Sequence, residues 1–352
     1  MKRKIAYIFC LFLLLAGCDN LILELPEGEG VDPSLVNFNL NLAVDPAMEP
    51  YVPSGKASDS EGNVTEHDVR WIVEIFRDEI DGEPESSCVL TCDPAPDGNH
   101  RYNTSFDVHA GKYVIVAWAD YVDDGSVADK YYNVSSLSQI SIAAPEDYIG
   151  NEEHKDTYVA VEEVDLTGYR DKWNSTADHS ITLQRPMAKI EFITTDVEKM
   201  LDNLAKLYNS SRHDANARLS DALLSANPDL GTIEIKVEYA GYLPSGFNVY
   251  TDKPNDAVLG MSFSSSLEQL SDEEARLGSD YVFVNGNESA VMVNLVISDN
   301  EGNLINRVDG IEVPIARGKL TTVKDEFLTK DYAPGIGIDP GFDGEIDIVI
   351  PE

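Results

Sequence analysis

Basic residues are scarce in this sequence. Lys and Arg together number 26 of 352 residues, against 63 Asp and Glu, which gives a net charge of −37. Outside the first four residues there is no Lys/Arg cluster that could neutralise phosphates, so nucleic acid is excluded as a partner. The chain still has enough apolar material to fold, with 43% hydrophobic residues and 16 Tyr, 11 Phe and 3 Trp. Its length corresponds to about two domains.

Catalytic motifs are also absent from the sequence. The six histidines are scattered singly, and no His-Glu-x-x-His, Gly-x-Ser-x-Gly, Walker A or complete Gly-x-Gly-x-x-Gly sequence occurs. The acidic stretch Asp339–Asp347 has Gly341, and Ile350 beyond it, where an EF-hand loop needs ligands, which favours a turn over a calcium site. We therefore predict a protein that is not an enzyme, with no catalytic residues, metal or cofactor.

The N-terminus has the parts of an export signal. A basic start is followed by an apolar run of 11 residues, Ile5–Leu15, which is too short to span a bilayer as a helix of about 20 residues. The run leads into Leu-Ala-Gly-Cys, ending at Cys18, which is similar to the lipobox of bacterial lipoproteins. We predict that residues 1–17 are a signal peptide, that Cys18 carries acyl chains, and that the acidic residues 18–34 form a flexible tether.

Cysteine is scarce too, with four in the chain. Cys10 lies in the signal peptide and Cys18 is the predicted lipidation site, so Cys88 and Cys92 remain. An exported pair can form a disulfide, and this spacing resembles no zinc framework. We interpret Cys88 and Cys92 as a surface-loop pair, oxidised to a disulfide or free according to their surroundings.

Alternating apolar and polar residues predict strands through most of the remaining chain. In Val36–Val44 nearly every second residue is apolar, which is typical of a strand with one buried face. Further strand patterns, separated by turn-rich segments, occur at 69–76, 101–109, 113–120, 138–143, 157–164, 232–239, 281–285, 290–298, 304–316 and 344–350. Short strands with few helices between them indicate a mainly β protein built from antiparallel sandwiches.

The polar stretch 167–179 divides this pattern into two parts. We predict an N-terminal β-sandwich domain over residues 35–166 and a C-terminal β-sandwich domain over residues 180–352. The second part opens with Ser180–Ile193, which has the composition of a strand but is interrupted by Pro186.

The C-terminal part also contains a predicted helical insertion, residues 196–226. Apolar residues recur at helical spacing from Val197 to Tyr208, and this pattern predicts one helix. A weaker pattern at Ala215–Ala226 predicts a second short helix. We expect both to cover one side of a sheet.

Several segments carry a family resemblance. They are Leu183–Phe192, which contains an Arg-x-x-Ala pattern, together with Gly246–Val249, Gly278–Phe283, Thr321–Thr329 and Ile338–Ile346. With the lipobox, they make the chain resemble the fimbrillin-like lipoproteins of Bacteroidota, the superfamily of type V pilins and their fimbrial anchor and accessory subunits. The resemblance covers nearly the whole mature chain, but its motifs are strand and turn segments rather than catalytic ones.

This resemblance implies two tandem transthyretin-like domains and a surface-exposed, lipid-anchored position on the outer membrane. For shaft subunits it also implies assembly with other fimbrial subunits by strand exchange, in which an Arg- or Lys-directed protease removes the first strand. In this chain Lys56 and Arg70 are the first basic residues after the signal peptide, and Arg70 adjoins the next strand. A protease confined to Arg finds no well-placed site, which favours an uncleaved anchor, accessory subunit or adhesin over a shaft subunit.

Two alternatives stay open at this point. The chain could be a surface glycan- or nutrient-binding lipoprotein, with Tyr121, Tyr131, Tyr132 and Trp173 as candidate sugar-stacking residues, although such side chains more often belong to a core. Separately, the strand pattern Glu345–Ile350 could complete its own domain's sheet or be donated to a neighbouring subunit. We expect the first use.

The lipid anchor generates the first testable prediction. Replacement of Cys18 by Ala should release the protein from the membrane without lowering its melting temperature, because a flexible tether separates the anchor from the fold. Cell fractionation and a thermal melt measure the two effects. A Cys18→Ala protein that still carries acyl chains and sediments with membranes would contradict the assignment.

Overall fold

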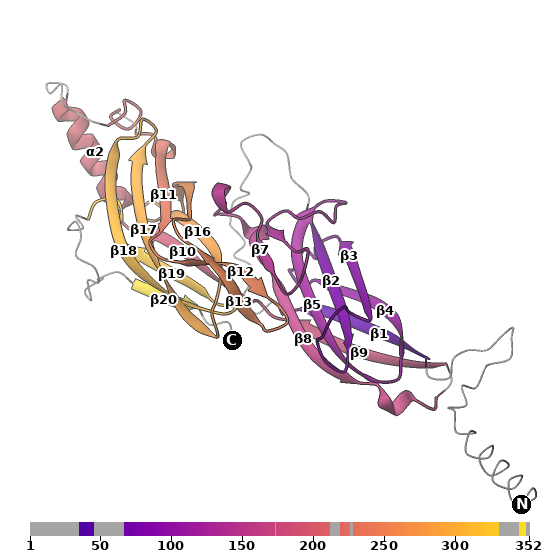
Figure 1. The fold of residues 1–352 in the computed structure, drawn as a ribbon. Coiled ribbons are helices and arrows are strands. Elements are labelled where there is room, and N and C mark those ends of the chain that lie inside the picture. Colours follow the sequence, from indigo (N-terminus) through magenta and orange to yellow (C-terminus); the bar gives the residue numbers. More distant parts are fainter. Residues whose placement is uncertain are drawn as a thin grey trace, which may run out of the picture.

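The computed structural model of the chain describes residues 35–45, 67–172, 174–211, 219–225, 228–330 and 345–349. The described residues form a mainly β fold of five sheets, most of whose strands pair antiparallel (Figure 1). The predicted signal peptide, the tether and the lipidation site Cys18 lie outside the described residues, as do Lys56, Trp173 and residues 339–344 of the acidic stretch.

Two sheets pack face to face in the N-terminal half and form what we call the N-terminal sheet pair. The first sheet has the order β4-β1-β9, with β1 (Leu35–Val44), β4 (Arg101–His109) and β9 (Ser175–Leu183). The second has the order β3-β2-β5-β8, with β2 (His67–Arg77), β3 (Ser86–Cys92), β5 (Lys112–Asp123) and β8 (Tyr158–Asp165).

The first strand, β1, lies in the middle of its sheet. It pairs antiparallel with β4 and parallel with β9, so the start of the described chain is held between two strands that are distant in sequence. The predicted alternation is confirmed, because one face of β1 is buried between the two sheets and the other is polar. The buried side chains, each at most 3% exposed, are Val36, Phe38, Leu40, Leu42 and Val44.

The C-terminal sheet pair has the same layered construction. One sheet has the order β15-β16-β10-β19-β20, with β10 (Met187–Thr194), β15 (Glu268–Gln269), β16 (Ala275–Phe283), β19 (Leu320–Asp325) and β20 (Glu345–Val349). The other has the order β14-β11-β17-β18, with β11 (Ile233–Tyr239), β14 (Ser262–Ser266), β17 (Glu288–Asp299) and β18 (Leu304–Ala316). The last strand, β20, pairs with β19 of its own sheet, which is the first of its two expected uses.

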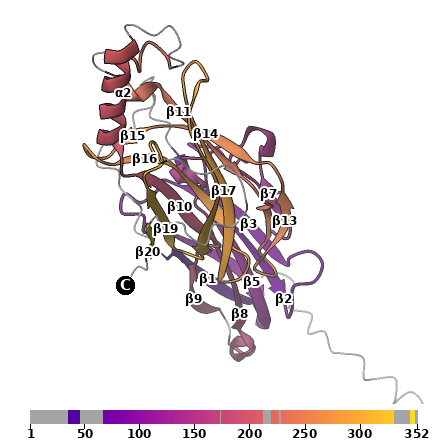
Figure 2. The ribbon, with the colours of Figure 1, turned by 90° about the vertical axis from the view of Figure 1, so that its left-hand side faces the viewer.

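One α-helix, α2 (Val197–Ser211), occurs in the described part of the chain, as its apolar spacing predicted. It buries Val197, Met200 and Leu204 against the core of the C-terminal sheet pair, at the end remote from the N-terminal half (Figures 1 and 2). The second predicted helix, Ala215–Ala226, is wrong over its described residues, 219–225, which form turns. There the N–H of Ser220 donates to the carboxylate of Asp299 at 2.6 Å, so a contact with β17 fixes the backbone.

The fifth sheet joins the two halves of the chain. Its order is β13-β12-β7-β6, with β6 (Tyr132–Asn133) and β7 (Ile140–Ile142) from the N-terminal half and β12 (Leu243–Asn248) and β13 (Lys253–Val258) from the C-terminal half. Gly246 permits the contact between β7 and β12, since a Cβ atom there would lie 2.9 Å from the carbonyl oxygen of Ile140.

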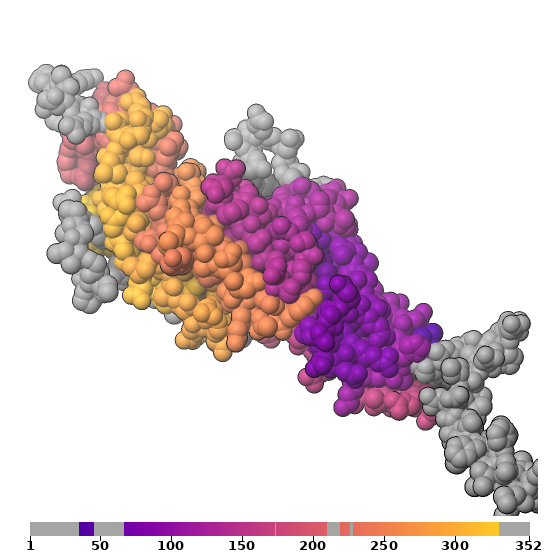
Figure 3. Space-filling model, viewed as in Figure 1, coloured from indigo at the N-terminus to yellow at the C-terminus, as the bar shows by residue number. Residues whose placement is uncertain are grey.

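Apolar side chains from both halves meet behind this mixed sheet. We call this cluster the junction core; it comprises Ile72, Phe76, Val114, Val116, Trp118, Tyr132, Leu137, Ile140, Val159, Met187, Phe247, Val249, Tyr281 and Phe283. The rings of Phe247 and Phe283 stack with centroids 5.2 Å apart, and Tyr132 approaches Phe283 at 5.7 Å. The surfaces of the two halves accordingly adjoin without a break in Figure 3.

Strand pairing crosses the predicted division at residues 167–179. Strand β9 begins at Ser175 and pairs with β1, whereas β10, which begins at Met187, belongs to the C-terminal sheet pair. The chain therefore passes from one sheet pair to the other at residues 184–186, where Pro186 interrupts the strand pattern.

The junction core generates the second prediction. Replacement of Phe247 by Ala should lower the free energy of unfolding by about 3–5 kcal/mol, because it removes a fully buried ring from both halves' shared core. Tyr242→Ala is the matched control, since Tyr242 precedes the same strand but is 70% exposed. Urea unfolding of both variants measures the difference. Equal, small effects would contradict the role of the junction core.

Candidate functional site

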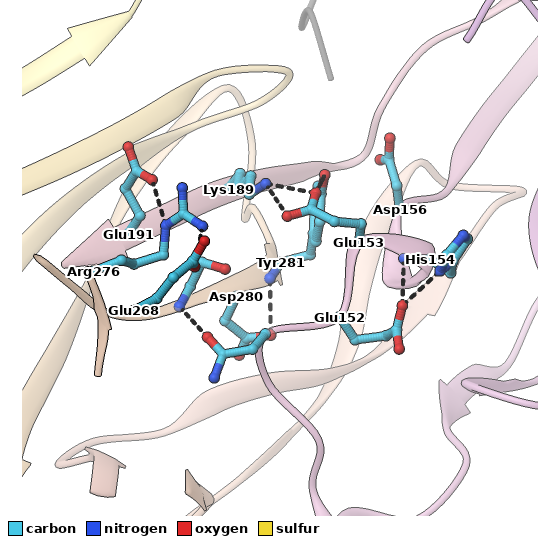
Figure 4. Close-up of polar contacts among 12 residues, drawn as sticks. Glu152, Glu153, His154, Asp156, Lys189, Glu191, Glu268, Arg276, Asp280 and Tyr281 are labelled. Carbon is cyan, nitrogen blue, oxygen red and sulfur yellow. Dashed lines mark hydrogen bonds and ion pairs between the residues drawn. The ribbon is translucent and has the colours of Figure 1, made fainter. Parts of the chain in front are cut away.

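A segment between β7 and β8 carries buried charge to the junction of the two sheet pairs. It contains two short 3₁₀ helices, η1 (Pro145–Asp147) and η2 (Glu153–Lys155). The N–H of Asn151 donates to the carbonyl of Ser279 in β16 at 2.8 Å, and Asn151 Oδ1 accepts from the Ser279 N–H at 2.7 Å. These two hydrogen bonds hold the segment against β16. Figure 4 shows the charged side chains of the segment and of the neighbouring strands β10 and β16.

A deeply buried ion pair joins this segment to β16. Lys155 Nζ lies 2.5 Å from Asp280 Oδ1, and the two side chains are 5% and 0% exposed. The hydroxyls of Tyr148 and Tyr239 each donate to Asp280 Oδ2 at 2.6 Å. Burial lowers the pKa of Lys155 against the opposing effect of Asp280, and burial raises the pKa of both tyrosines. The carboxylate of Asp280 therefore has donors on both oxygens.

A second buried pair lies where the chain passes between the sheet pairs. Arg185 Nε lies 2.8 Å from Asp156 Oδ2, and Arg185 Nη2 donates to the hydroxyl of Tyr158 at 2.7 Å. Burial disfavours the charge of the guanidinium, but Asp156 and Tyr158 outweigh it and raise the pKa of Arg185. This pair fixes the start of β8 to the connection between β9 and β10.

Further ion pairs lie along β10 and β16 (Figure 4). Together with the pairs of Lys155 and Arg185, they form what we call the network. Lys189 Nζ lies 2.6 Å from both oxygens of Glu153. Arg276 contacts Glu191 at 3.4 Å and Glu268 at 2.7 Å. The carboxylates of this network are thus engaged by cations, and the arrangement suits holding elements together rather than general acid–base catalysis.

The described residues contain neither a metal-ligating group nor a membrane-spanning helix. Within the described ranges, no group of three or more His, Cys, Asp or Glu side chains is placed to hold a metal ion. The one described α-helix and the short 3₁₀ turns include none that is long and apolar enough to cross a membrane.

An open groove of about 770 Å³ lies beside the network. It is lined by β8, the end of β9 and the turn between β18 and β19, and it includes Val161, Thr182, Asp252 and Arg317. Arg317 forms a two-pronged ion pair with Asp252, at 2.6 and 2.8 Å. No aromatic side chain lines the groove, so it lacks the stacking surface that sugar recognition commonly uses.

The three described candidates for sugar stacking do not form an exposed platform. Tyr132 is 1% exposed, and its hydroxyl donates to the carbonyl of Lys155 at 2.6 Å. Tyr121 and Tyr131 are half-buried and contact histidines instead. Tyr132 therefore belongs to the interior, and Tyr121 and Tyr131 are partly covered by other side chains of the fold.

Cys88 and Cys92 are free thiols within one edge strand, β3, rather than a surface-loop pair; Cys88 is its third residue and Cys92 its last. Their Cα atoms are four residue steps apart along the extended strand, which is about 13 Å, whereas a disulfide needs less than about 7 Å. The disulfide considered for this pair is therefore excluded in this fold. Burial raises the pKa of both thiols, and Cys92 Sγ accepts a hydrogen bond from Trp71 Nε1 at 3.4 Å.

Arg70, one of the two candidate processing residues, is locked inside β2. Its side chain is 2% exposed and contacts Asp120 at 2.6 Å and Asp129 at 2.8 Å. A protease would have to open β2 to reach this residue. The other candidate, Lys56, lies outside the described residues.

The buried ion pairs were missed by sequence reasoning. Lys155 and Asp280 are 125 positions apart, and neither belongs to a recognisable motif. The available signal was the position of Asp280, a charged residue directly before the apolar run Tyr281–Val284. A carboxylate inside a buried strand requires a partner, although the sequence does not say which cation supplies it.

Comparison with known proteins identifies one family. Residues 33–351 match the family described as "Family of unknown function (DUF6562)". No curated protein matches the chain.

Solved structures with a similar course of the chain come from Bacteroidota. The fimbrial anchor protein Mfa2 from Porphyromonas gingivalis is 12% identical, with a TM-score of 0.42 over 82% of this chain and 90% of that one. A candidate polysaccharide-binding protein from Bacteroides thetaiotaomicron is 13% identical, with a TM-score of 0.43 over 78% and 80%. A candidate cell adhesion protein from Bacteroides eggerthii is 14% identical, with a TM-score of 0.42 over 92% and 97%.

The buried network generates the third prediction. Lys155→Met should lower the free energy of unfolding by about 3–5 kcal/mol, because it leaves Asp280 charged and without its cation in the interior. Lys199→Met is the control, since the pair of Lys199 with Glu326 is about half exposed on both sides and should contribute little. Chemical denaturation measures both. A Lys155→Met protein as stable as the control would show that the pair is dispensable.

Proposed function

Because the chain belongs to a family of unknown function (DUF6562), we propose a role from its own sequence and fold: a non-enzymatic, lipid-anchored surface protein of fimbrial type on the outer membrane. The lipobox-like sequence ending at Cys18 carries this proposal, since it follows a basic start and an apolar run in the correct register. Acyl chains on Cys18 would hold the folded part outside the membrane on the acidic tether.

The domain organisation proposed here is two tandem transthyretin-like sandwiches. The two sheet pairs, each with its own apolar core, support it. In this proposal the boundary falls at residues 184–186, and the junction core and the ion pairs of Lys155 and Arg185 make the two domains one stiff unit. A stiff unit suits a part that transmits force between a membrane anchor and an attached structure.

Within this class we favour an anchor, accessory subunit or adhesin over a shaft subunit. A shaft subunit would lose its first strand to a protease and accept a replacement. Here β1 is the central strand of its sheet, and the nearest described basic residue after it, Arg70, is buried in an ion pair. These two observations support a protein that keeps β1 and does not polymerise through the slot that β1 fills.

A glycan- or nutrient-binding lipoprotein is the alternative function. The groove beside β8 is large enough for a small oligosaccharide and is lined by both polar and apolar side chains. However, Tyr132 is buried, and Tyr121 and Tyr131 contact histidines instead of presenting open rings, so this alternative has the weaker support.

Deletion of the gene tests the proposal and supplies the fourth prediction. Cells that lack the protein should carry fewer or detached fimbriae, or adhere less, and the wild-type gene should restore the phenotype where Cys18→Ala does not. Electron microscopy and an adhesion assay measure these effects. Unchanged fimbriae and adhesion, together with micromolar binding to a glycan array, would overturn the proposal in favour of glycan binding.

A further inference from the structure

The outer edge of strand β8, on the side away from β5, is open along most of its length. Within the described part of the chain, β8 pairs along its length with β5, and one isolated bridge joins its start to Gln184, directly after β9. In this bridge the N–H of Val159 donates to the carbonyl of Gln184 at 2.8 Å, and the Gln184 N–H donates back at 2.9 Å. The backbone groups of Val159 therefore point away from β5.

Backbone groups further along the same edge point the same way. Because the direction of the N–H and C=O groups alternates along a strand, those of Val161 and Glu163 also point outward. The pairing between β8 and the end of β9 stops at the bridge, and no described strand pairs with this edge beyond it. Such an edge is a template onto which another extended segment can add.

The groove beside β8 gives an added segment room to lie along this edge. Strand β8 contributes residues 159–162 to the lining of the groove, and the turn between β18 and β19 contributes residues 316–319. Val161 lies in this lining and is 42% exposed, which is high for a large apolar side chain. The edge therefore offers an added segment both backbone hydrogen bonds and an apolar contact.

Carboxylates determine which kind of segment this edge accepts. Glu163 and Asp165 follow Val161 at every second position, so the three side chains lie on one face of β8, and all three are exposed. Strand β8 contains no Lys or Arg. Opposite charges on neighbouring strands stabilise their pairing and like charges destabilise it. A second copy paired through the same edge would oppose carboxylates to carboxylates, in a chain of net charge −37, so a basic segment is favoured.

The cations that line the groove do not reverse this preference. Arg185 is paired with Asp156, and Arg317 is paired with Asp252. Lys319 comes from the turn between β18 and β19 rather than from β8. The lining also includes the carboxylates of Asp45, Glu162 and Glu288.

We propose that the outer edge of β8 is a docking edge for an extended segment of a partner protein, with basic side chains opposite Glu163 and Asp165 and an apolar side chain opposite Val161. The segment adds one more strand to the sheet β3-β2-β5-β8. This proposal rests on the proposed function, because an anchor or accessory subunit that keeps β1 needs another surface to join its neighbours. The edge is separate from the slot of β1, which lies in the facing sheet.

Binding of a defined peptide to the purified mature chain tests the docking edge. The probe is a labelled peptide with blocked ends, Lys-Thr-Lys-Thr-Val-Thr, which, antiparallel to β8, places its lysines opposite Asp165 and Glu163 and its valine opposite Val161. Fluorescence anisotropy should show binding that weakens as the salt concentration rises, and the same peptide with Glu for Lys should bind at least about tenfold more weakly. Equal binding of both peptides, or no binding of the lysine peptide, would overturn the proposal.

The variant Val161→Pro separates strand pairing from a general attraction to an acidic protein. It removes the outward N–H of Val161 and keeps the hydrogen bonds with β5, which the alternate residues Ala160 and Glu162 make. The lysine peptide should bind this variant about tenfold more weakly. Val161→Thr is the matched control, because it keeps the N–H and a β-branched side chain, and it should bind as the wild type does. Equal affinity of the two variants would contradict the docking edge.

A charge reversal keeps the test decisive if the proline variant does not fold. Glu163 is exposed, so Glu163→Lys should leave the melting temperature unchanged and should shift the preference toward the glutamate peptide. Glu312→Lys is the control, since Glu312 is exposed on another edge strand, β18, and this variant should still prefer the lysine peptide. An unchanged preference in Glu163→Lys would refute the proposed charge pairing.

A gene replacement distinguishes failure of the docking edge from failure of the proposed function. Deletion of the gene tests the proposed function, and a deletion strain that expresses Val161→Pro tests the docking edge. Fimbriae or adhesion that are lost on deletion and are restored by Val161→Thr but not by Val161→Pro would support both. Full restoration by Val161→Pro would overturn the docking edge and leave the proposed function standing.

Discussion

The N-terminal half of this protein depends on one strand, β1. It is the central strand of its sheet, between β4 and β9, and it buries the side chains of Val36, Phe38, Leu40, Leu42 and Val44. At about 1.5–3 kcal/mol for each fully buried side chain, β1 contributes an amount comparable to the whole stability of a domain, about 5–15 kcal/mol. Without β1, an apolar slot and two unpaired strand edges would be exposed. The strand must therefore remain in place or be replaced by another.

The second constraint is the junction between the two sheet pairs. Apolar burial supplies it through Phe247, Phe283 and Tyr132, and the mixed sheet adds backbone pairing between β7 and β12. The ion pairs of Lys155 and Arg185 then specify one arrangement, because a displaced junction would leave these charges buried without partners. A protein of this construction resists bending at its middle, which fits the proposed role at the cell surface.

Local pattern predicted the regular strands and the amphipathic helix. Alternation identified β1, β2, β5 and the β17–β18 hairpin, because each buries one face or both along most of its length. It missed β3, a short edge strand rich in Ser and Thr, and β12, in which Pro244 and Gly246 interrupt the pattern. The partner that stabilises β12 is β7, about 100 residues earlier, and no local signal encodes that pairing. The same limit applies to β9 and to the buried ion pairs.

The proposed role depends most directly on whether β1 stays covalently attached to the rest of the chain. Mass spectrometry of the protein extracted from the cell surface measures this, because lipidation and cleavage leave different N-termini. An uncleaved anchor or accessory subunit should give a single N-terminal peptide that begins at an acylated Cys18 and continues through β1. A new terminus at Ala57 or Trp71, produced by cleavage after Lys56 or Arg70, would contradict it and identify the protein as a polymerising subunit.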